Sequence, residues 1–135
     1  MGFLTGSRPS KLGLTNGQLH PVKAHLQNSV SSFADTDEHK IAAFVAAPNP
    51  RQTFTRLADA VKATSGATVV TQDGNYIYAE FQTPLMKFTD DVEFLLDEGN
   101  AVIHVRSASR LGRKDFGANR KRIELLREAI KTKLG

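Results

Sequence analysis

Two segments around residue 100 show the most regular alternation of hydrophobic and polar residues. In residues 90–97 and 101–109, alternate side chains are apolar, which is the period of a strand with one buried face. A turn containing Gly99 separates the two segments, so we predict that they pair as an antiparallel hairpin. The predicted apolar face consists of Val92, Phe94, Leu96, Ala101, Ile103 and Val105.

Two turns fit this hairpin, and they differ in the partner of Arg106. A turn at residues 98–99 pairs Arg106 with Asp91 and Glu93 with His104. A turn one residue later pairs Arg106 with Glu93 instead. Both registers keep one face apolar and place Arg106 opposite a carboxylate, a pair that contributes about 0.2–1 kcal/mol.

Two further elements are predicted upstream. A helix is expected after Asn49-Pro50, because asparagine caps helices and proline suits their first position; its apolar residues run from Phe54 to Val61, and Gly66 is predicted to cap its end. A second hairpin is expected around Asp73-Gly74, a dipeptide typical of two-residue type I′ turns.

A long helix is predicted to close the chain, from Asp115 or Phe116 to Lys133. Its apolar residues form one stripe, made by Phe116, Ile123, Leu126, Ile130 and Leu134. The expected fold is α+β: a mainly antiparallel sheet of four or five strands, covered on one face by the internal helix and the C-terminal helix. We expect residues 1–40, which lack sustained periodicity, to form an irregular N-terminal arm, and residues 41–135 to form a single domain.

Composition excludes several classes of protein. The 135 residues contain no cysteine, so disulfides, thiolate metal sites and cysteine nucleophiles are ruled out. No apolar run approaches the ~20 residues of a membrane span, so we predict a cytoplasmic protein, with a peripheral position on a membrane complex as a second option. The charge is uneven: residues 1–100 hold 8 Lys/Arg and 11 Asp/Glu, whereas residues 101–135 hold 10 and 3. Such a split suits either an anionic partner or internal pairing.

The basic part begins with the junction RSASRLGRKDFGANRKRI, residues 106–123. Asp115 is predicted to cap the last helix, and Gly112 to allow the sharp turn into it. Asn119 falls in the middle of the apolar stripe, where an amide without partners would cost about 1–3 kcal/mol. Two interpretations remain open: Asn119 bonds the nearby loop backbone, or it lines a polar pocket with Arg106 and the serines of the junction.

The arginines of the junction also allow two interpretations. Around the helix start, where free N–H groups favour anions, they would form a phosphate or carboxylate site. Alternatively, they pair with the acids of the preceding strand. The arginines are Arg110, Arg113, Arg120 and Arg122, and the acids are Asp90, Asp91 and Glu93.

FTDDVEF followed by RSASRLGRKDFGANRKRI closely resembles the family catalogued as domain of unknown function 1499, and LGLTNGQL and VSS resemble its N-terminal region. The resemblance implies no activity, since none is assigned to the family. Members of similar N-terminal design usually carry two cysteines before the Ser-Ser; here the nearest positions are Val22 and Ser29, so any role of that pair is absent. The motif falls on Asp90, Asp91, Glu93, Phe94, Arg106, Ser107, Ser109, Arg110, Gly112, Asp115, Gly117, Asn119 and Arg122.

We predict a non-catalytic binding or assembly-assisting module, because no nucleophile motif, metal-ligand cluster or cofactor motif occurs. No catalytic residue, metal or cofactor is therefore assigned, and the partner is expected to be a protein or a small anionic ligand. The candidate binding residues are Arg106, Ser107, Ser109, Arg110, Asn119 and Arg122. The residues of the motif expected to be structural are Asp90, Asp91, Glu93, Gly112, Asp115 and Gly117.

Two alternatives compete with this hypothesis. The first is an enzyme that holds an anionic substrate with Arg106, Arg110 and Asn119 and uses Glu93 or His104 as acid–base. The second is a binder of nucleic acid or anionic membrane through the basic C-terminal helix. Nucleic acid is disfavoured, because no aromatic residues are interleaved for base stacking. The basic residues of this alternative are Arg113, Lys114, Arg120, Lys121, Arg127, Lys131 and Lys133.

Overall fold

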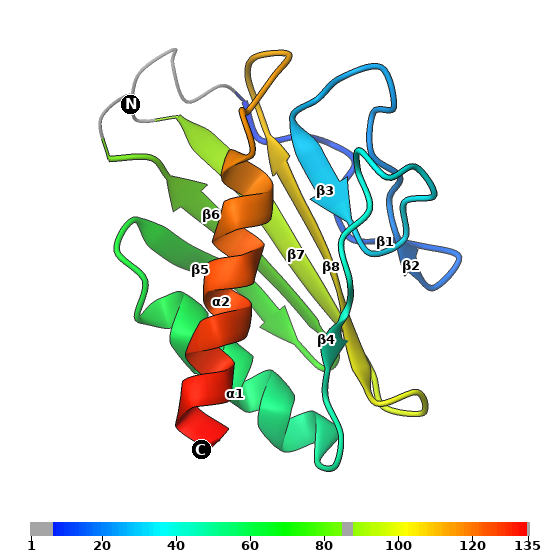
Figure 1. The fold of residues 1–135 in the computed structure, drawn as a ribbon, viewed down its shortest axis with the longest axis vertical. Helices are drawn as coiled ribbons and strands as arrows, with labels where there is room; N and C mark the ends of the chain where they lie inside the picture. The colour runs from blue at the N-terminus through cyan, green and yellow to red at the C-terminus, as the bar shows by residue number, and fades with distance from the viewer. Residues whose placement is uncertain (1–6, 85–87, 135) are drawn as a thin grey trace.

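A computed structural model describes residues 7–84 and 88–134, with the side chains of residues 132–134 outside the description. In this part of the chain a six-stranded antiparallel sheet has the order β3-β8-β7-β6-β5, with β4 also paired to β8 (Figure 1). Its strands are β3 (Ser29–Ser31), β4 (Phe44–Val45), β5 (Ala67–Asp73), β6 (Tyr76–Gln82), β7 (Thr89–Asp97) and β8 (Val102–Ser109). The predicted α+β fold is confirmed. The sheet exceeds the expected four or five strands because β3 and β4 both pair with one edge of β8.

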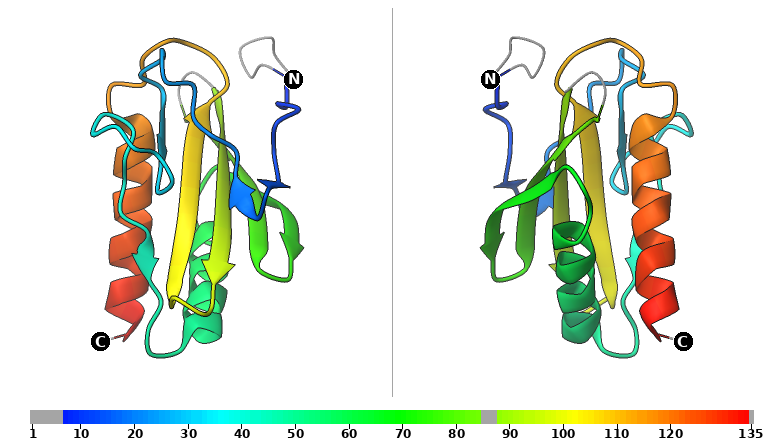
Figure 2. Two further views of the ribbon diagram at one scale, coloured as in Figure 1. Left: turned by 90° about the vertical axis from the view of Figure 1, so that its right-hand side faces the viewer. Right: turned by 90° about the vertical axis from the view of Figure 1, so that its left-hand side faces the viewer.

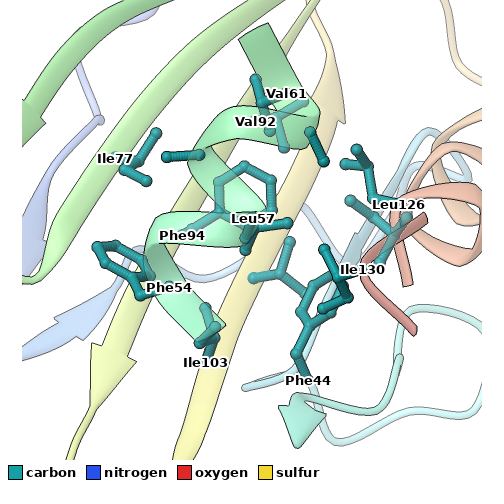
Figure 3. Close-up of a cluster of buried hydrophobic side chains, with 14 of the residues drawn as sticks. Phe44, Phe54, Leu57, Val61, Ile77, Val92, Phe94, Ile103, Leu126 and Ile130 are labelled. Carbon is teal, nitrogen blue, oxygen red and sulfur yellow. The ribbon is translucent and has the colours of Figure 1, made fainter. Parts of the chain in front are cut away.

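Both helices, α1 (Pro50–Lys62) and α2 (Ala118–Leu134), cover the same face of the sheet, here called the inner face (Figures 1 and 2). The alternation predicted for β7 and β8 supplies the sheet side of the core, where Phe94 and Ile103 are fully buried. Leu57 of α1 and Ile130 of α2 close over them (Figure 3). The apolar stripes of both helices thus meet the apolar face of the hairpin.

The hairpin between β7 and β8 has the second of the two predicted registers. Glu93 lies opposite Arg106, and Leu95, not Glu93, lies opposite His104. The connection spans residues 98–101. The Glu93–His104 pair of the first register therefore does not form, and these two residues are not placed as an acid–base pair.

Several predicted boundaries are corrected. Helix α1 ends at Lys62 with Ala63 as its cap, so Gly66 is not the cap; it lies so close to β6 that an added Cβ would be 2.6 Å from the Gln82 backbone oxygen. In the β5–β6 hairpin Asp73 pairs with Tyr76, so the turn is Gly74-Asn75. Gly74, at φ 59°, occupies the first central position, where type II′ turns require glycine.

The start of α2 also differs from the prediction. The helix begins at Ala118, because Asp115 accepts hydrogen bonds from the Gly117 and Asn119 backbone N–H groups and so sets the first turn beyond itself. Phe116 lies outside the helix and is 93% exposed, so its place in the apolar stripe is wrong. Ile123, Leu126 and Ile130 are buried as expected, whereas the side chains of Lys133 and Leu134 fall outside the described residues.

The N-terminal arm, residues 1–40, contains structure that its composition did not indicate. It includes a small hairpin of β1 (Leu14–Thr15) and β2 (Gln18–Leu19) as well as β3. The hairpin lies against the outer face of the sheet, opposite the helices (Figure 2). Whether residues 41–135 form a domain without the arm stays a prediction. No helix in the described part of the chain is long and apolar enough to cross a membrane.

Candidate functional site

Asn119 is fully buried at the start of α2, and both ends of its amide have hydrogen-bond partners. Its Oδ1 accepts from Ser107 Oγ (2.7 Å) and Arg122 Nη1 (2.9 Å). Its Nδ2 donates to Ser109 Oγ (2.9 Å) and to the Asn28 backbone oxygen (3.0 Å). The amide therefore ties the first turn of α2 to β8 and to the arm, and it does not line the cavity described below.

These bonds belong to a group on the inner face, here called the inner polar cluster. Arg122 extends it by pairing with Asp90 of β7, with Nη2 2.6 Å from Oδ2. The Arg122 guanidinium also lies over the Phe81 ring, 5.1 Å from its centroid. The cluster comprises Asn28, Asp90, Ser107, Ser109, Asp115, Asn119 and Arg122, and internal pairing was one of the two interpretations of its arginine.

A second group, the outer ion network, lies on the opposite face of the sheet. Glu93 has no exposed surface, and it accepts from Arg106 Nη1 (3.1 Å), the Tyr76 hydroxyl (2.5 Å) and the Gly13 backbone N–H (2.7 Å). Three donors satisfy this carboxylate, so burial does not leave its charge uncompensated. Because Gly13 belongs to the arm, Glu93 also fastens the arm to the sheet.

Beside Glu93, Asp91 is bound by Arg110, whose Nε and Nη2 both lie 2.9 Å from the carboxylate oxygens. This two-pronged contact, with a further bond to Glu80, raises the pKa of Arg110. Burial would raise the pKa of Glu80, but hydrogen bonds from Arg8 and Arg110 outweigh it and lower that pKa. The network thus consists of Glu80, Asp91, Glu93, Arg106 and Arg110, with Tyr76, Tyr78 and Arg8 bound to it.

Tyr76 and Tyr78 remain neutral donors in this network. Burial, followed by the hydrogen bond to Glu93, raises the pKa of the Tyr76 phenol. Burial and the hydrogen bond to Asp91 raise that of Tyr78 in the same way. Neither phenol is therefore available as a base at neutral pH.

A cavity of about 630 Å³, here called the arm cavity, lies between the arm and the outer face of the sheet. The arm contributes residues from two segments, 7–11 and 20–29. The sheet and the loop after β8 contribute Asp91, Arg106, Ala108 and Arg110. The basic side chains on its wall outnumber the acidic one, Asp91. The arm residues on the wall are Ser7, Pro9, Ser10, Lys11, His20, Pro21, Val22, Lys23, Leu26, Asn28 and Ser29.

Two buried polar atoms on this wall stand out. Arg106 Nε and Ser29 Oγ have no hydrogen-bond partner within residues 7–84 and 88–134. Their residues are 8% and 5% exposed. Nearly all other buried side-chain polar atoms in the described chain are satisfied, as is usual in proteins, so these two are unused hydrogen-bonding groups of residues that line the arm cavity.

The structure divides the predicted candidates into two groups. Arg106, Ser109 and Arg110 line the arm cavity, whereas Ser107, Asn119 and Arg122 do not. Gly112, expected to be structural, has φ 86° and also lines the cavity. The other predicted structural residues lie in one of the two polar groups, except Gly117 with φ 83° at the start of α2. Sequence reasoning missed Ser29 and the arm residues, because only the β3–β8 pairing brings them to the junction.

His104 lies on the outer face of β8, away from both groups. Its ring stacks on Phe33 with 4.1 Å between centroids, and its Nδ1 is 3.0 Å from Ser32 Oγ. Ser107 faces the inner side, so the two form no catalytic pair. No group of three or more potential metal ligands occurs among the described residues.

Burial, with a smaller effect of Lys40, lowers the pKa of His104. Because the folded state binds the proton less tightly than the unfolded state, His104 contributes stability above its ordinary pKa of about 6.5, and that contribution is lost as the pH falls through the folded value. We therefore expect His104→Gln to flatten the fall in the free energy of unfolding between pH 7 and pH 5, measured by urea denaturation. The exposed His25→Gln serves as control, and an unchanged slope in His104→Gln would contradict the expectation.

Comparison with known proteins gives one match. The model of the family described as "Protein of unknown function (DUF1499)" matches residues 22–130. This range contains the inner polar cluster and, apart from Arg8, the outer ion network. It excludes the first 21 residues of the arm. No curated protein and no solved structure matches the chain significantly.

Proposed function

The chain belongs to the family of proteins of unknown function DUF1499, and because that description assigns no activity, we propose from the geometry that the protein is a non-catalytic binding module whose arm cavity holds a small ligand. The observation that carries the proposal is the arm cavity itself, with two unpartnered buried polar atoms on its wall. Cavities of several hundred Å³ with a few placed polar groups are typical of small-molecule sites.

The contacts of the reactive groups support the non-catalytic part of the proposal. Arg110 binds Asp91 through its Nε and Nη2, the edge that would hold an anionic substrate. Holding a substrate with both Arg106 and Arg110 would therefore break this buried ion pair. Asn119 lies on the other face of the sheet, so it does not converge with them on one site. The enzyme alternative required that convergence, and the observed arrangement argues against it.

The basic helix supports the third candidate less well than its sequence suggested. Arg127 bonds Glu124 and the backbone oxygens of Ala42 and Ala43, and Lys131 pairs with Glu128. The two glutamates weaken the local positive potential that an anionic polymer or membrane would meet there. Binding of the small ligand in the arm cavity is therefore the better-supported function.

The proposal is tested by filling the cavity. Ala108 of β8 lies on its wall, so Ala108→Phe is expected to abolish binding of fragments from a mixture of acids, bases and neutral compounds, followed by ligand-observed NMR. Val102→Phe, on the same face of the same strand but outside the cavity, is the matched control and should bind like the natural chain. Equal fragment binding in Ala108→Phe, or turnover of any bound fragment by the natural chain, would contradict the proposal.

A further inference from the structure

We infer that the ligand of the arm cavity is a small monocarboxylate with an apolar body, recognised by Arg106 and Ser29. This inference rests on the proposed function and names the chemical class of its ligand. Part of the Arg106 guanidinium has no hydrogen-bond partner among the described residues. Among the described residues this side chain bonds only to Glu93, through Nη1. The edge formed by Nε and Nη2 is left over, and this edge of an arginine offers two parallel N–H donors that match a carboxylate.

Ser29 supplies the second contact. In the β3–β8 ladder Ser31 lies opposite Arg106 and Ser29 opposite Ala108, so Ser29 and Arg106 are diagonal neighbours on the outer face. The Arg106 side chain extends toward Glu93 on β7, away from β3, so a ligand that reaches both residues lies across the outer face of β8. The Ser29 hydroxyl, like Arg106 Nε, is buried and has no partner among the described residues. One acceptor group would therefore satisfy two donors that the fold leaves unused.

The other charges on the wall determine how many charges the ligand carries. Lys11, Lys23 and Arg110 favour a negative ligand, but Asp91 lies on the same wall and Glu93 accepts from Arg106 directly behind it. Two carboxylates so close repel a second negative charge, so a monoanion fits better than a phosphate dianion. The wall also carries apolar side chains, which suit a hydrocarbon body; they are Pro9, Pro21, Val22, Leu26 and Ala108.

Entry of the ligand requires the arm to lift, since both donor atoms are hidden from solvent. The described start of the arm is held to the outer face by few polar contacts. They are the bond from the Gly13 N–H to Glu93 and the ion pair between Arg8 and Glu80, in which Arg8 is half exposed. Exposed ion pairs contribute little to stability, so the residues around Arg8 lift at low cost. The Gly13 bond to the buried Glu93 carboxylate holds the next part of the arm more firmly.

The test compares hexanoate with hexanamide, its uncharged analogue, and with inorganic phosphate, by titration calorimetry on the full chain. Hexanoate is expected to bind at least about tenfold more tightly than either, because hydrogen bonds to a charged group are the stronger ones. Arg106→Lys keeps the charge beside Glu93 but removes the two-donor edge, and should weaken hexanoate binding about tenfold. Ser29→Ala should weaken it about fivefold without disturbing the ion pair.

Matched controls are Ser65→Ala, an exposed serine outside the arm cavity, and Arg120→Lys, an arginine outside it; both should bind hexanoate like the natural chain. Equal affinity for hexanamide, stronger binding of phosphate, or unchanged affinity in both Arg106→Lys and Ser29→Ala would overturn the assignment of a carboxylate. If fragments still bind in a manner that Ala108→Phe abolishes, the binding module stands and only its ligand class is wrong. If no fragment binds, the proposed function itself fails.

Discussion

Replacing Glu93 by alanine is expected to lower the free energy of unfolding by about 3–5 kcal/mol, the cost of leaving a buried charge without its partner. Arg106, only 8% exposed, would keep its charge and lose its only acceptor among the described residues. Tyr76 and the Gly13 N–H would lose theirs as well. Since whole domains are stable by only about 5–15 kcal/mol, this single change removes a large part of the total. Urea denaturation at neutral pH measures it.

Two comparisons separate the ion pair from simple packing. Glu98→Ala removes an exposed carboxylate paired with Arg51, and should change the free energy of unfolding by less than about 1 kcal/mol. The double variant Glu93→Leu with Arg106→Met removes both charges and should recover most of the loss, because apolar replacement of a buried pair is often neutral. A loss below about 1 kcal/mol in Glu93→Ala would show that Arg106 finds another acceptor.

The alternation in β7 and β8 shows what the sequence could predict. The alternation of apolar and polar residues predicts which side chains of both strands face inward. The two possible turns leave Arg106 with two possible partners, and in the structure its partner is Glu93. Periodicity could not choose between them, because both registers keep the same face apolar. The choice depends on the four residues 98–101, whose turn geometry their composition did not specify.

The candidate site was less predictable, because its wall joins segments far apart in the chain. Ser29 and Arg106 meet only through the β3–β8 ladder, and β3 is too short to show a period. The arm reaches the outer face through single contacts such as Gly13 with Glu93, which leave no sequence pattern. The sequence singles out the junction, yet four of its six predicted binding residues lie in the inner polar cluster and serve internal contacts.

Phe116 was wrongly predicted to be buried, because the periodicity of a helix does not show where the helix begins. Helical periodicity placed it on the buried stripe, but the Asp115 cap starts the helix two residues later and leaves Phe116 at φ 53°. A capping aspartate followed by glycine two residues on was a signal against that prediction, since glycine can adopt the positive φ of 83° that Gly117 has just before the helix. Local chemistry at a helix end therefore overrides the period of the residues beyond it.

Asn119→Leu is expected to lower the free energy of unfolding by about 2–4 kcal/mol while leaving hexanoate affinity of the folded protein unchanged. Leucine resembles asparagine in shape but offers no bonds, so the Ser107 hydroxyl loses its acceptor and Ser109 Oγ and the Asn28 backbone oxygen each lose a donor. Buried groups left unpaired cost about 1–3 kcal/mol each, with partial relief where a second bond survives. Urea denaturation gives the stability, and calorimetry the affinity.

The exposed Lys121→Leu, two residues along the same helix, tests whether leucine is tolerated there and should be nearly neutral. Asn119→Asp is a stricter variant: it keeps the acceptor for Ser107 but places a carboxylate where Nδ2 now lies 2.7 Å from Asp115, so it should also destabilise. The two interpretations of Asn119 diverge here. A residue that ties α2 to β8 changes stability alone, whereas a ligand-binding residue changes affinity at nearly constant stability, and that second outcome would return Asn119 to the candidate site.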